Sequence, residues 1–330
     1  MPMRASRYSQ DEIIRCAWLY YEQDYTQDEI ARKLDMSRAR VVRLLKEARA
    51  RGLVQIKINA PINLLALAER LQTLYRPLNL NRVYVVQTVA DAEEQKILLA
   101  RELGSVFTPR RGDSIAISWG TTLSYAVDLL PPQPAMDLTI ISILGGIQGS
   151  IHTANPYDIA FRLGQRWHAA VYMLQAPAFV RDPEVSALLL REESLQETLE
   201  LASHARVALF SGGELSDNST LERLNAISRE ERLWLLSRGA VGDLLCHFLD
   251  SEGNILDLQG RLTTISLPLE RLKRIPERIC LGGGPAKHEI ILAMLRGGYI
   301  TTLITDEVTA HYLAEKAVAP PAATASRGTM

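Results

Sequence analysis

The sequence lacks the features of membrane, secreted and metal-cluster proteins. No stretch of its 330 residues approaches the roughly 20 consecutive apolar residues that cross a bilayer, and residues 1–10 contain no apolar signal-peptide core. Its three cysteines and six histidines are scattered along the chain, so we expect neither a disulfide framework nor a bound metal or other cofactor. We therefore expect a cytoplasmic protein with no membrane partner.

Net charge is also nearly absent, at −1, but this value hides an asymmetry. Residues 1–59 carry 12 Lys and Arg against 8 Asp and Glu, whereas residues 60–330 carry 25 against 30. Six of the basic residues fall within 37–51, together with a single acid, Glu47. A small basic module joined to a larger acidic one is typical of a nucleic-acid reader attached to a second domain. The same charge run is also the usual composition of a solvated helix face.

The first 59 residues predict a separate domain of three short helices. Apolar residues recur at helical spacing over 9–21, 26–34 and 37–51. Residues 35–36 form the expected tight turn between the second and third helices, and residues 53–59 alternate as a short strand does. Each helical segment opens on a residue that favours helix N-caps, namely Ser9, Thr26 and Ser37.

The second and third segments have the spacing of a helix-turn-helix. Ala31 is small enough for two helices to cross closely, and Val41 and Leu44 face inward. The third helix would lie in the major groove, where Arg38 and Arg43 can donate bidentately to guanine. Its outward positions are Ser37, Arg38, Ala39, Val42, Arg43 and Lys46. We predict DNA contacts from Thr26, Gln27, Ser37, Arg38, Arg40, Arg43 and Lys46. A three-helix bundle with a solvated basic face is the alternative.

Residues 60–316 predict a larger, layered α/β domain. Short apolar runs, mostly without alternation, are separated by helical segments such as 91–107, 158–168 and 287–295. Runs of this kind are typical of parallel strands that are covered on both faces and bind ligands at their carboxyl ends. The expected strands are 83–86, 114–118, 138–144, 207–210, 279–281 and 302–304. The small, Pro-rich residues 317–330 predict a disordered tail.

Two glycine-bearing turns after predicted strands have the chemistry of an anion site. Residues 119–122 (WGTT) open a helix, so that the Gly120 and Thr121 amides and two hydroxyls can surround a phosphate. The triplet 282–284 (GGG) precedes Lys287 at the start of another helix, and a glycine loop, a helix N-terminus and a lysine together favour an anion. The alternative is structural: the glycines serve tight turns, and the threonines and Asp306 cap helices.

Four further stretches carry a family resemblance: ISWGTTL (117–123), ISILGG (141–146), GAVGDLLCHFLDSEG (239–253) and CLGGGPAKHEIILAMLRGGYITTLITDEVTAHYL (280–313). Together with the helix-turn-helix, they resemble the SorC type of sugar-binding transcriptional regulator over about residues 11–313. The resemblance implies an effector domain similar to sugar-phosphate isomerases and deaminases, in a homo-oligomer that is usually a tetramer. It implies operator DNA and a phosphorylated sugar as partners. The effector-binding residues that it implies are Gly120, Thr121, Thr122, Gln148, Asn155, Asp243, Gly283 and Lys287.

The main alternative is an enzyme that isomerises or deaminates sugar phosphates. Such chemistry needs a general base near C1–C2 of the sugar, for which Asp243, His247 and Asp250 are the candidates. The apolar neighbours of His247 predict a packed core histidine instead, and the sequence contains no nucleophile elbow, Walker loop or HExxH motif. A constitutive nucleoid-type DNA binder, the third class, would not need the larger domain. We therefore expect a transcriptional regulator. The sequence leaves open whether it represses or activates transcription, and whether its effector sugar is phosphorylated or free.

Overall fold

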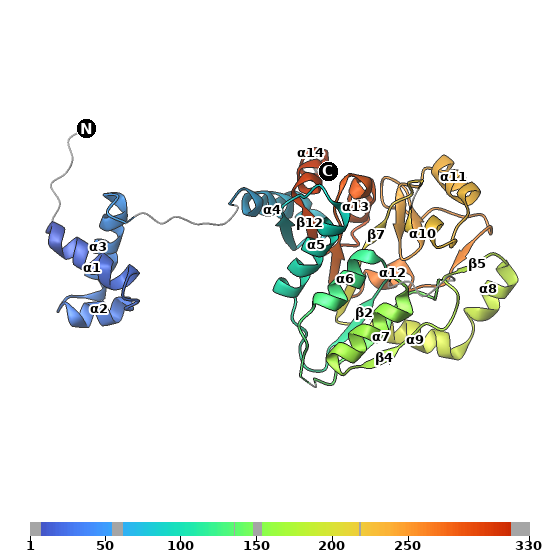
Figure 1. The fold of residues 1–330 in the computed structure, drawn as a ribbon, viewed down its shortest axis with the longest axis horizontal. Coiled ribbons are helices and arrows are strands. Elements are labelled where there is room, and N and C mark those ends of the chain that lie inside the picture. Colours follow the sequence, from blue (N-terminus) through green and yellow to red (C-terminus); the bar gives the residue numbers. More distant parts are fainter. Residues whose placement is uncertain (1–7, 55–61, 135, 148–153, 218, 318–330) are drawn as a thin grey trace, which may run out of the picture. The chain divides into compact units, whose positions relative to one another are not determined.

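The chain forms two compact units, residues 1–61 and residues 62–330 (Figure 1). The predictions for residues 55–59, for Gln148 and for 318–330 lie outside the described part of the chain. No described helix is long and apolar enough to span a membrane. The computed structural model describes residues 8–54, 62–134, 136–147, 154–217 and 219–317.

The smaller unit consists of α1 (Gln10–Tyr21), α2 (Gln27–Lys33) and α3 (Arg38–Ala50). All three helices begin at the predicted caps, and the Ser9 and Thr26 caps are completed by a glutamate three residues later. Asp35 turns the chain between α2 and α3 with a φ of 49°, a left-handed conformation that aspartate adopts more readily than most residues. The helices enclose one apolar core that includes Ile13, Ile30 and Leu44.

The larger unit is built on a seven-stranded sheet in which all neighbouring strands are parallel. The strand order is β1-β12-β11-β6-β2-β3-β4. All six predicted strands belong to this sheet, and β4 is an additional edge strand. The strands are β1 (Arg82–Val86), β2 (Ser114–Ile117), β3 (Thr139–Ser142), β4 (Ala170–Tyr172), β6 (Val207–Phe210), β11 (Glu277–Leu281) and β12 (Thr302–Asp306).

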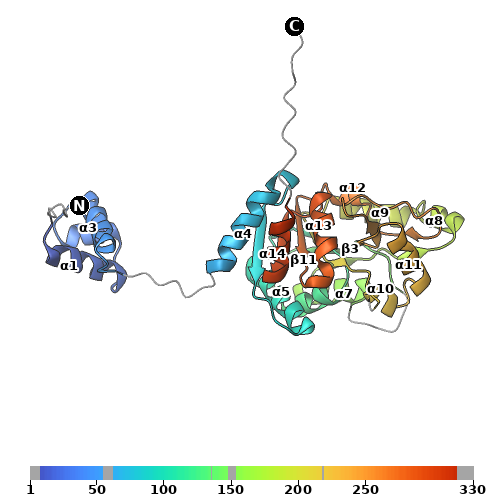
Figure 2. The same ribbon diagram turned by 90° about the horizontal axis from the view of Figure 1, so that it is seen from above.

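Helices cover both faces of this sheet (Figure 2). Each face has its own apolar core. In β2, Ala116 faces one core, whereas Ile115 and Ile117 face the other. The strands are therefore apolar on both sides, and the predicted layered α/β class is confirmed. The first core contains residues of α4 (Ile62–Tyr75), α9 (Glu193–Ser203), α12 (Leu269–Leu272), α13 (His288–Arg296) and α14 (Glu307–Lys316). The second contains residues of α5 (Ala92–Val106), α6 (Thr121–Leu129), α7 (Pro156–Trp167) and α11 (Arg229–Ser237).

Two small antiparallel sheets complete the larger unit. In the first, β7 (Gly212–Gly213) pairs with β8 (Gly242–Leu244), which forms a hairpin with β9 (His247–Leu249). In the second, β5 (Phe179–Val180) pairs with β10 (Thr263–Thr264). Because β7 directly follows β6, the hairpin lies next to the carboxyl edge of the main sheet. The remaining elements are α8 (Pro183–Leu189), α10 (Thr220–Arg223), η1 (Arg76–Leu78) and η2 (Pro285–Lys287).

Candidate functional site

The outward face of α3 is exposed and mostly basic. In the described part of the chain, neither Arg43 nor Lys46 pairs with a carboxylate, and Arg43 only donates to the Ala39 carbonyl of its own helix. Arg38 lies 3.6 Å from the Asp28 carboxylate in an exposed pair, which contributes little to stability. These cations are therefore free to meet DNA. The residues predicted to face outward, Ser37, Arg38, Ala39, Val42, Arg43 and Lys46, are all exposed.

Arg40 has a partner within the unit. Its Nη2 donates to Oε1 of Glu12 at 2.8 Å, and its guanidinium lies 5.9 Å from the centre of the Tyr8 ring. Arg40 therefore joins α3 to α1, a role that the sequence did not predict. At the start of α2, Thr26 is exposed and Gln27 half-buried, and the Thr26 hydroxyl donates to the Glu29 carboxylate at 2.7 Å.

The larger unit brings most of the predicted effector residues to the carboxyl edge of its sheet. Strands β2, β6, β11 and β12 are consecutive neighbours there. They lead into Gly120, Ser211, the 282–284 loop and Asp306, respectively. Parallel strands present their ligand sites at this edge. Gly120, Thr121, Thr122, Gly283 and Lys287 thus belong to one region, as the sequence indicated.

Lys287 is a cation without an ion pair in the described part of the chain. Its Nζ donates to the Ser211 hydroxyl at 3.0 Å, a neutral partner. Burial lowers the pKa of Lys287, and the nearby Lys96 ammonium acts in the same direction, whereas Glu214 and Asp243 oppose the shift. Lys287 is half-buried, and a partly desolvated cation that lacks a counter-ion is unfavourable, so an anionic ligand here would be stabilising.

Asp243 lies on β8, close enough to Lys287 for their charges to interact. Its side chain is buried, and Oδ2 accepts a hydrogen bond from the Cys246 amide at 2.9 Å. Burial raises the pKa of Asp243 to about 6, although the Cys246 amide and Lys287 both act to lower it. The other oxygen, Oδ1, has no hydrogen-bond partner among the described residues and is therefore a spare acceptor.

Gly283 leaves room for a neighbouring carboxylate. A β-carbon at this position would lie 2.7 Å from Oδ2 of Asp306 and 2.9 Å from Cγ. Asp306 is the N-cap of α14, as the structural alternative predicted, because its Oδ1 accepts a hydrogen bond from the Thr309 amide at 2.8 Å. The Gly284 amide donates to the Thr309 hydroxyl at 3.0 Å, which fixes the glycine loop against α14.

Gly120 to Thr122 differ in part from the predicted phosphate loop. The Gly120 amide donates to the Ala154 carbonyl at 3.3 Å, so it is already occupied. Gly120 has a φ of 118°, which only glycine adopts readily, and α6 begins after it without a side-chain cap. Thr122 is buried, and Thr121 is half-buried. The first-turn amides of α6, which no helix can satisfy internally, are the remaining donors.

Asn155 has a structural role at the start of α7. Its Oδ1 accepts a hydrogen bond from the Tyr157 amide at 3.0 Å, and its Nδ2 donates to the Ile147 carbonyl at 3.1 Å. Both ends of the amide side chain are thus engaged within the protein. The predicted contact between Asn155 and a ligand would compete with these bonds. Nothing can be added for Gln148, which lies outside the described residues.

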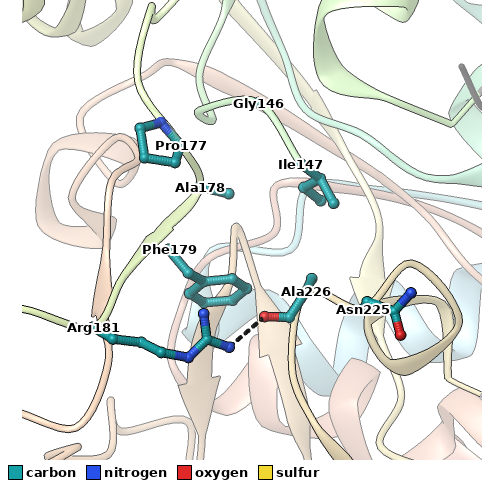
Figure 3. A pocket seen from close by; sticks show the side chains of 8 residues that line it. All are labelled: Gly146, Ile147, Pro177, Ala178, Phe179, Arg181, Asn225 and Ala226. Carbon is teal, nitrogen blue, oxygen red and sulfur yellow. Dashed lines mark hydrogen bonds between the residues drawn. The ribbon is translucent and has the colours of Figure 1, made fainter. Parts of the chain in front are cut away.

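A small pocket lies between the loop after β3 and the segment around β5 (Figure 3). Its cation, Arg181, donates to the Ala226 carbonyl and is neutralised by Glu231 at 3.0 Å. None of the predicted effector residues that the structure describes lines it. The pocket therefore has less of the chemistry of an anion site than the part of the carboxyl edge that surrounds Lys287, Ser211 and Asp243. This part is called the Lys287 edge below. It is lined by Gly146, Ile147, Pro177, Ala178, Phe179, Arg181, Asn225 and Ala226.

Two residues of the Lys287 edge escape prediction from the sequence. Ser211 follows the strand 207–210 and precedes two glycines, which is the same signal that marks the 282–284 loop. Lys96, on α5, carries no such local signal, and its ammonium pairs with Glu93 at 2.5 Å. Only the folded chain brings its charge near Lys287.

The candidate general bases do not form a catalytic group. His247 is the packed histidine that its apolar neighbours predict, because its Nε2 lies 3.0 Å from the Ser266 hydroxyl and burial lowers its pKa to about 4. Asp250 holds a turn, accepting hydrogen bonds from the Glu252 and Asn254 amides at 2.9 Å. Asp243 alone faces the Lys287 edge.

Comparison with known families accounts for both units. Residues 61–315 match the putative sugar-binding domain, and residues 9–51 match sigma-70, region 4. The chain belongs to the SorC-type family of sugar-binding transcriptional regulators. This match confirms the family resemblance seen in the sequence. The named relatives of the chain are transcriptional regulators.

The family relationship extends over almost the whole chain. The protein is 32% identical to the transcriptional regulator LsrR of Escherichia coli O139:H28, over 91% of this chain and 93% of that one. It is 30% identical to the deoxyribonucleoside regulator of Bacillus subtilis (strain 168), over 93% and 98%. The crystal structure of the full-length sorbitol operon regulator SorC from Klebsiella pneumoniae matches with a TM-score of 0.69 and 27% identity, over 93% of this chain and 100% of that one.

Proposed function

We propose that the protein is a DNA-binding regulator of a carbohydrate-utilisation operon, controlled allosterically by a phosphorylated sugar or related metabolite. The observation that carries the effector proposal is Lys287, a half-buried cation at the carboxyl edge of the sheet whose hydrogen-bond partner is the neutral Ser211 hydroxyl. The family relationship and the basic face of α3 support the DNA-binding part.

The surroundings of Lys287 favour an anion together with hydroxyl groups. Helix α6 begins directly after Gly120 without a side-chain cap, and its first-turn amides carry partial positive charge. An anionic phosphate fits these donors and the ammonium. Asp243 has a buried, unpartnered Oδ1, which suits a hydroxyl donor of the same ligand.

Control of transcription requires that the ligand distinguish two arrangements of the DNA-binding units. We propose a homo-oligomer, a tetramer in solution, that presents pairs of α3 helices to operator half-sites about 10 base pairs apart or a multiple of that spacing. Light scattering of the full chain at micromolar concentration tests this assembly. A stable monomer bound to its operator would contradict it.

We propose that the larger unit binds its ligand without transforming it. His247 is held against Ser266 with its pKa lowered to about 4, and Asp250 is engaged in a turn, so neither is a general base for a sugar at the Lys287 edge. Incubation of the protein with a panel of aldose and ketose phosphates, followed by product analysis, is expected to show no turnover. Turnover would favour the isomerase or deaminase alternative.

A thermal-shift screen of the full chain tests the effector site. Phosphorylated sugars are assayed beside their unphosphorylated parents, with wild-type protein, Lys287→Met and Lys273→Met. Lys273 is a matched control, because it pairs with Glu270 on the surface at 3.2 Å. We expect one or more phosphates to stabilise the wild type and Lys273→Met but not Lys287→Met. An equal shift in all three proteins would place the ligand elsewhere.

A further inference from the structure

Val42 interrupts the basic face of α3 with an exposed apolar side chain. It is 44% exposed and lies one turn from Arg38 on one side and from Lys46 on the other. Within α3, all of whose residues the structure describes, it is the one large apolar side chain that is exposed. The core of the unit uses Val41, Leu44, Leu45 and Ala48 from this helix and does not include Val42.

Helix formation does not explain valine at this position either. A β-branched residue has a lower helix propensity than alanine, lysine or arginine, because the helix restricts its χ1 angle. The same restriction holds the two methyl groups of Val42 in one orientation, unlike the long side chains of Arg43 and Lys46. Val42 is therefore a rigid apolar group, without a packing partner in the core, on an otherwise polar surface.

The charge around Val42 identifies the kind of surface that it faces. Arg38, Val42 and Lys46 form one ridge of the helix at i, i+4 spacing, and Ala39 and Arg43 form the next ridge. Val42 and Ala39 are thus a small apolar area among cations that have no strong ion pair in the described chain. A protein or lipid partner held by apolar contact would need a larger area than these two side chains. Duplex DNA presents both phosphates and, in its major groove, the apolar 5-methyl group of thymine.

We propose that Val42, with Ala39 beside it, contacts the 5-methyl group of a thymine and sets the specificity of α3 at that base pair in each half-site. This inference rests on the proposed binding of DNA by α3. Arg38 and Arg43 would then read the base pairs on either side through hydrogen bonds, while Val42 distinguishes thymine by apolar contact. The recognition helix would combine two kinds of base contact on adjacent ridges.

The test uses the full chain and a duplex that the protein itself selects from random sequences. Each thymine of that duplex is replaced in turn by deoxyuridine, which removes only the 5-methyl group. Fluorescence anisotropy then measures the affinity of wild type, Val42→Ala and Ile14→Ala for each duplex. Ile14, on α1, is a matched control because it is apolar and 45% exposed but lies outside the recognition helix.

At one thymine in each half-site, deoxyuridine is expected to weaken binding by the wild type and by Ile14→Ala about fourfold. The same replacement should leave Val42→Ala unaffected. Val42→Ala on the unmodified duplex should match the wild type on a duplex in which this thymine is replaced by deoxyuridine in both half-sites.

The inference is overturned if no thymine shows this dependence on Val42. It is also overturned if Val42→Ala weakens binding to selected and random duplexes equally, with or without a lower melting temperature in circular dichroism. A wild-type protein that selects no sequence at all would overturn the proposed DNA recognition itself, which is a separate outcome from selection without a methyl effect.

Discussion

Oδ2 of Asp306, which has no hydrogen-bond partner among the described residues, lies 2.7 Å from the point that a β-carbon on Gly283 would occupy. Asp243 repeats this arrangement, because its unpartnered Oδ1 would overlap a β-carbon on Gly213. In both aspartates, the second oxygen accepts a hydrogen bond from the backbone amide three residues further along the chain. Each buried acid at the carboxyl edge therefore depends on a glycine that leaves room for it.

The first prediction concerns Gly283. Gly283→Ala is expected to lower the free energy of unfolding by about 1–3 kcal/mol, because the new methyl group must displace the Asp306 side chain that caps α14. Urea unfolding of the full chain measures the change. Gly104→Ala, in α5, is the matched control. Its β-carbon would meet only the Leu129 carbonyl oxygen at 3.7 Å and Cδ of Pro131 at 3.9 Å, both ordinary contacts, so we expect unchanged or higher stability.

A double variant tests whether the loss of stability comes from the clash between the new β-carbon at position 283 and the Asp306 carboxylate, or from a general effect of Gly283→Ala on the loop. Asp306→Ser keeps a side chain that caps helices but removes Oδ2. If the clash is the cause, Gly283→Ala should lower stability much less in the Asp306→Ser background than in the wild type. Additive effects of the two substitutions would show that the contact between Gly283 and Asp306 is not responsible.

The second prediction is a pH dependence caused by Asp243. Burial raises its pKa from 3.8 to about 6 in the folded protein, so the folded state binds this proton more tightly than the unfolded state. The contribution of Asp243 to the free energy of unfolding therefore falls as the pH rises from about 4 to about 6, by up to about 3 kcal/mol. Asp243→Asn should remove this loss and be more stable than the wild type at pH 7 without ligand.

Comparing Asp243→Asn with the wild type separates the effect of Asp243 on the pH dependence of stability from the effect of His247. Burial lowers the pKa of His247 from 6.5 to about 4, so its contribution to stability rises over the same pH range and masks the effect in the wild type. Urea unfolding at several pH values should give a difference, variant minus wild type, that grows between pH 4 and 6 and is constant above. A difference that does not change with pH would refute the raised pKa.

The third prediction concerns base readout by α3. Arg43→Ala is expected to weaken binding to a selected operator by about 1–3 kcal/mol, with a smaller loss for random duplexes, because a bidentate contact with guanine is specific. Lys46→Ala, which removes a phosphate contact, should weaken both kinds of duplex equally. Electrophoretic mobility shifts with both duplexes make the comparison. If Arg43→Ala weakens binding to the two duplexes equally, the face of α3 assigned here to the major groove is wrong.

The fourth prediction concerns Arg40, whose ion pair with Glu12 joins α3 to α1. Arg40→Ala should lower the melting temperature of the small unit slightly, because partly exposed ion pairs contribute about 0.2–1 kcal/mol. Glu12→Gln should have a similar effect on melting without removing a cation from the DNA-binding face. If only Arg40→Ala weakens DNA binding, Arg40 also contacts the DNA, as the sequence predicts.

Local patterns are sufficient to predict most of the fold. The caps of α1, α2 and α3 and the apolar runs of six strands are contiguous in the sequence, so they can be recognised without knowledge of tertiary structure. β4 escapes prediction because it has three residues and lies half-exposed at the sheet edge, which leaves it without a long apolar run. The order of the strands is set by packing between segments that are far apart.

The candidate site could be predicted only as separate pieces. The 282–284 loop and Lys287 are recognisable because a glycine turn and a lysine follow a strand. Ser211 stands 76 positions from Lys287, and their contact exists because β6 and β11 are neighbours in the sheet. The use of Gly283 to make room for Asp306 depends in the same way on the neighbouring strands β11 and β12.

The central claim is that a phosphorylated ligand at Lys287 controls DNA binding by α3. Its most direct test is fluorescence anisotropy of a selected operator duplex with the full chain, titrated with the sugar phosphate found by thermal shift and with its unphosphorylated parent. We predict that the phosphate changes operator affinity at a concentration at least about 10-fold lower than the parent does. Lys287→Met should bind the duplex normally without ligand and lose this response. Equal potency of the two compounds, or an unchanged response in Lys287→Met, would contradict the account.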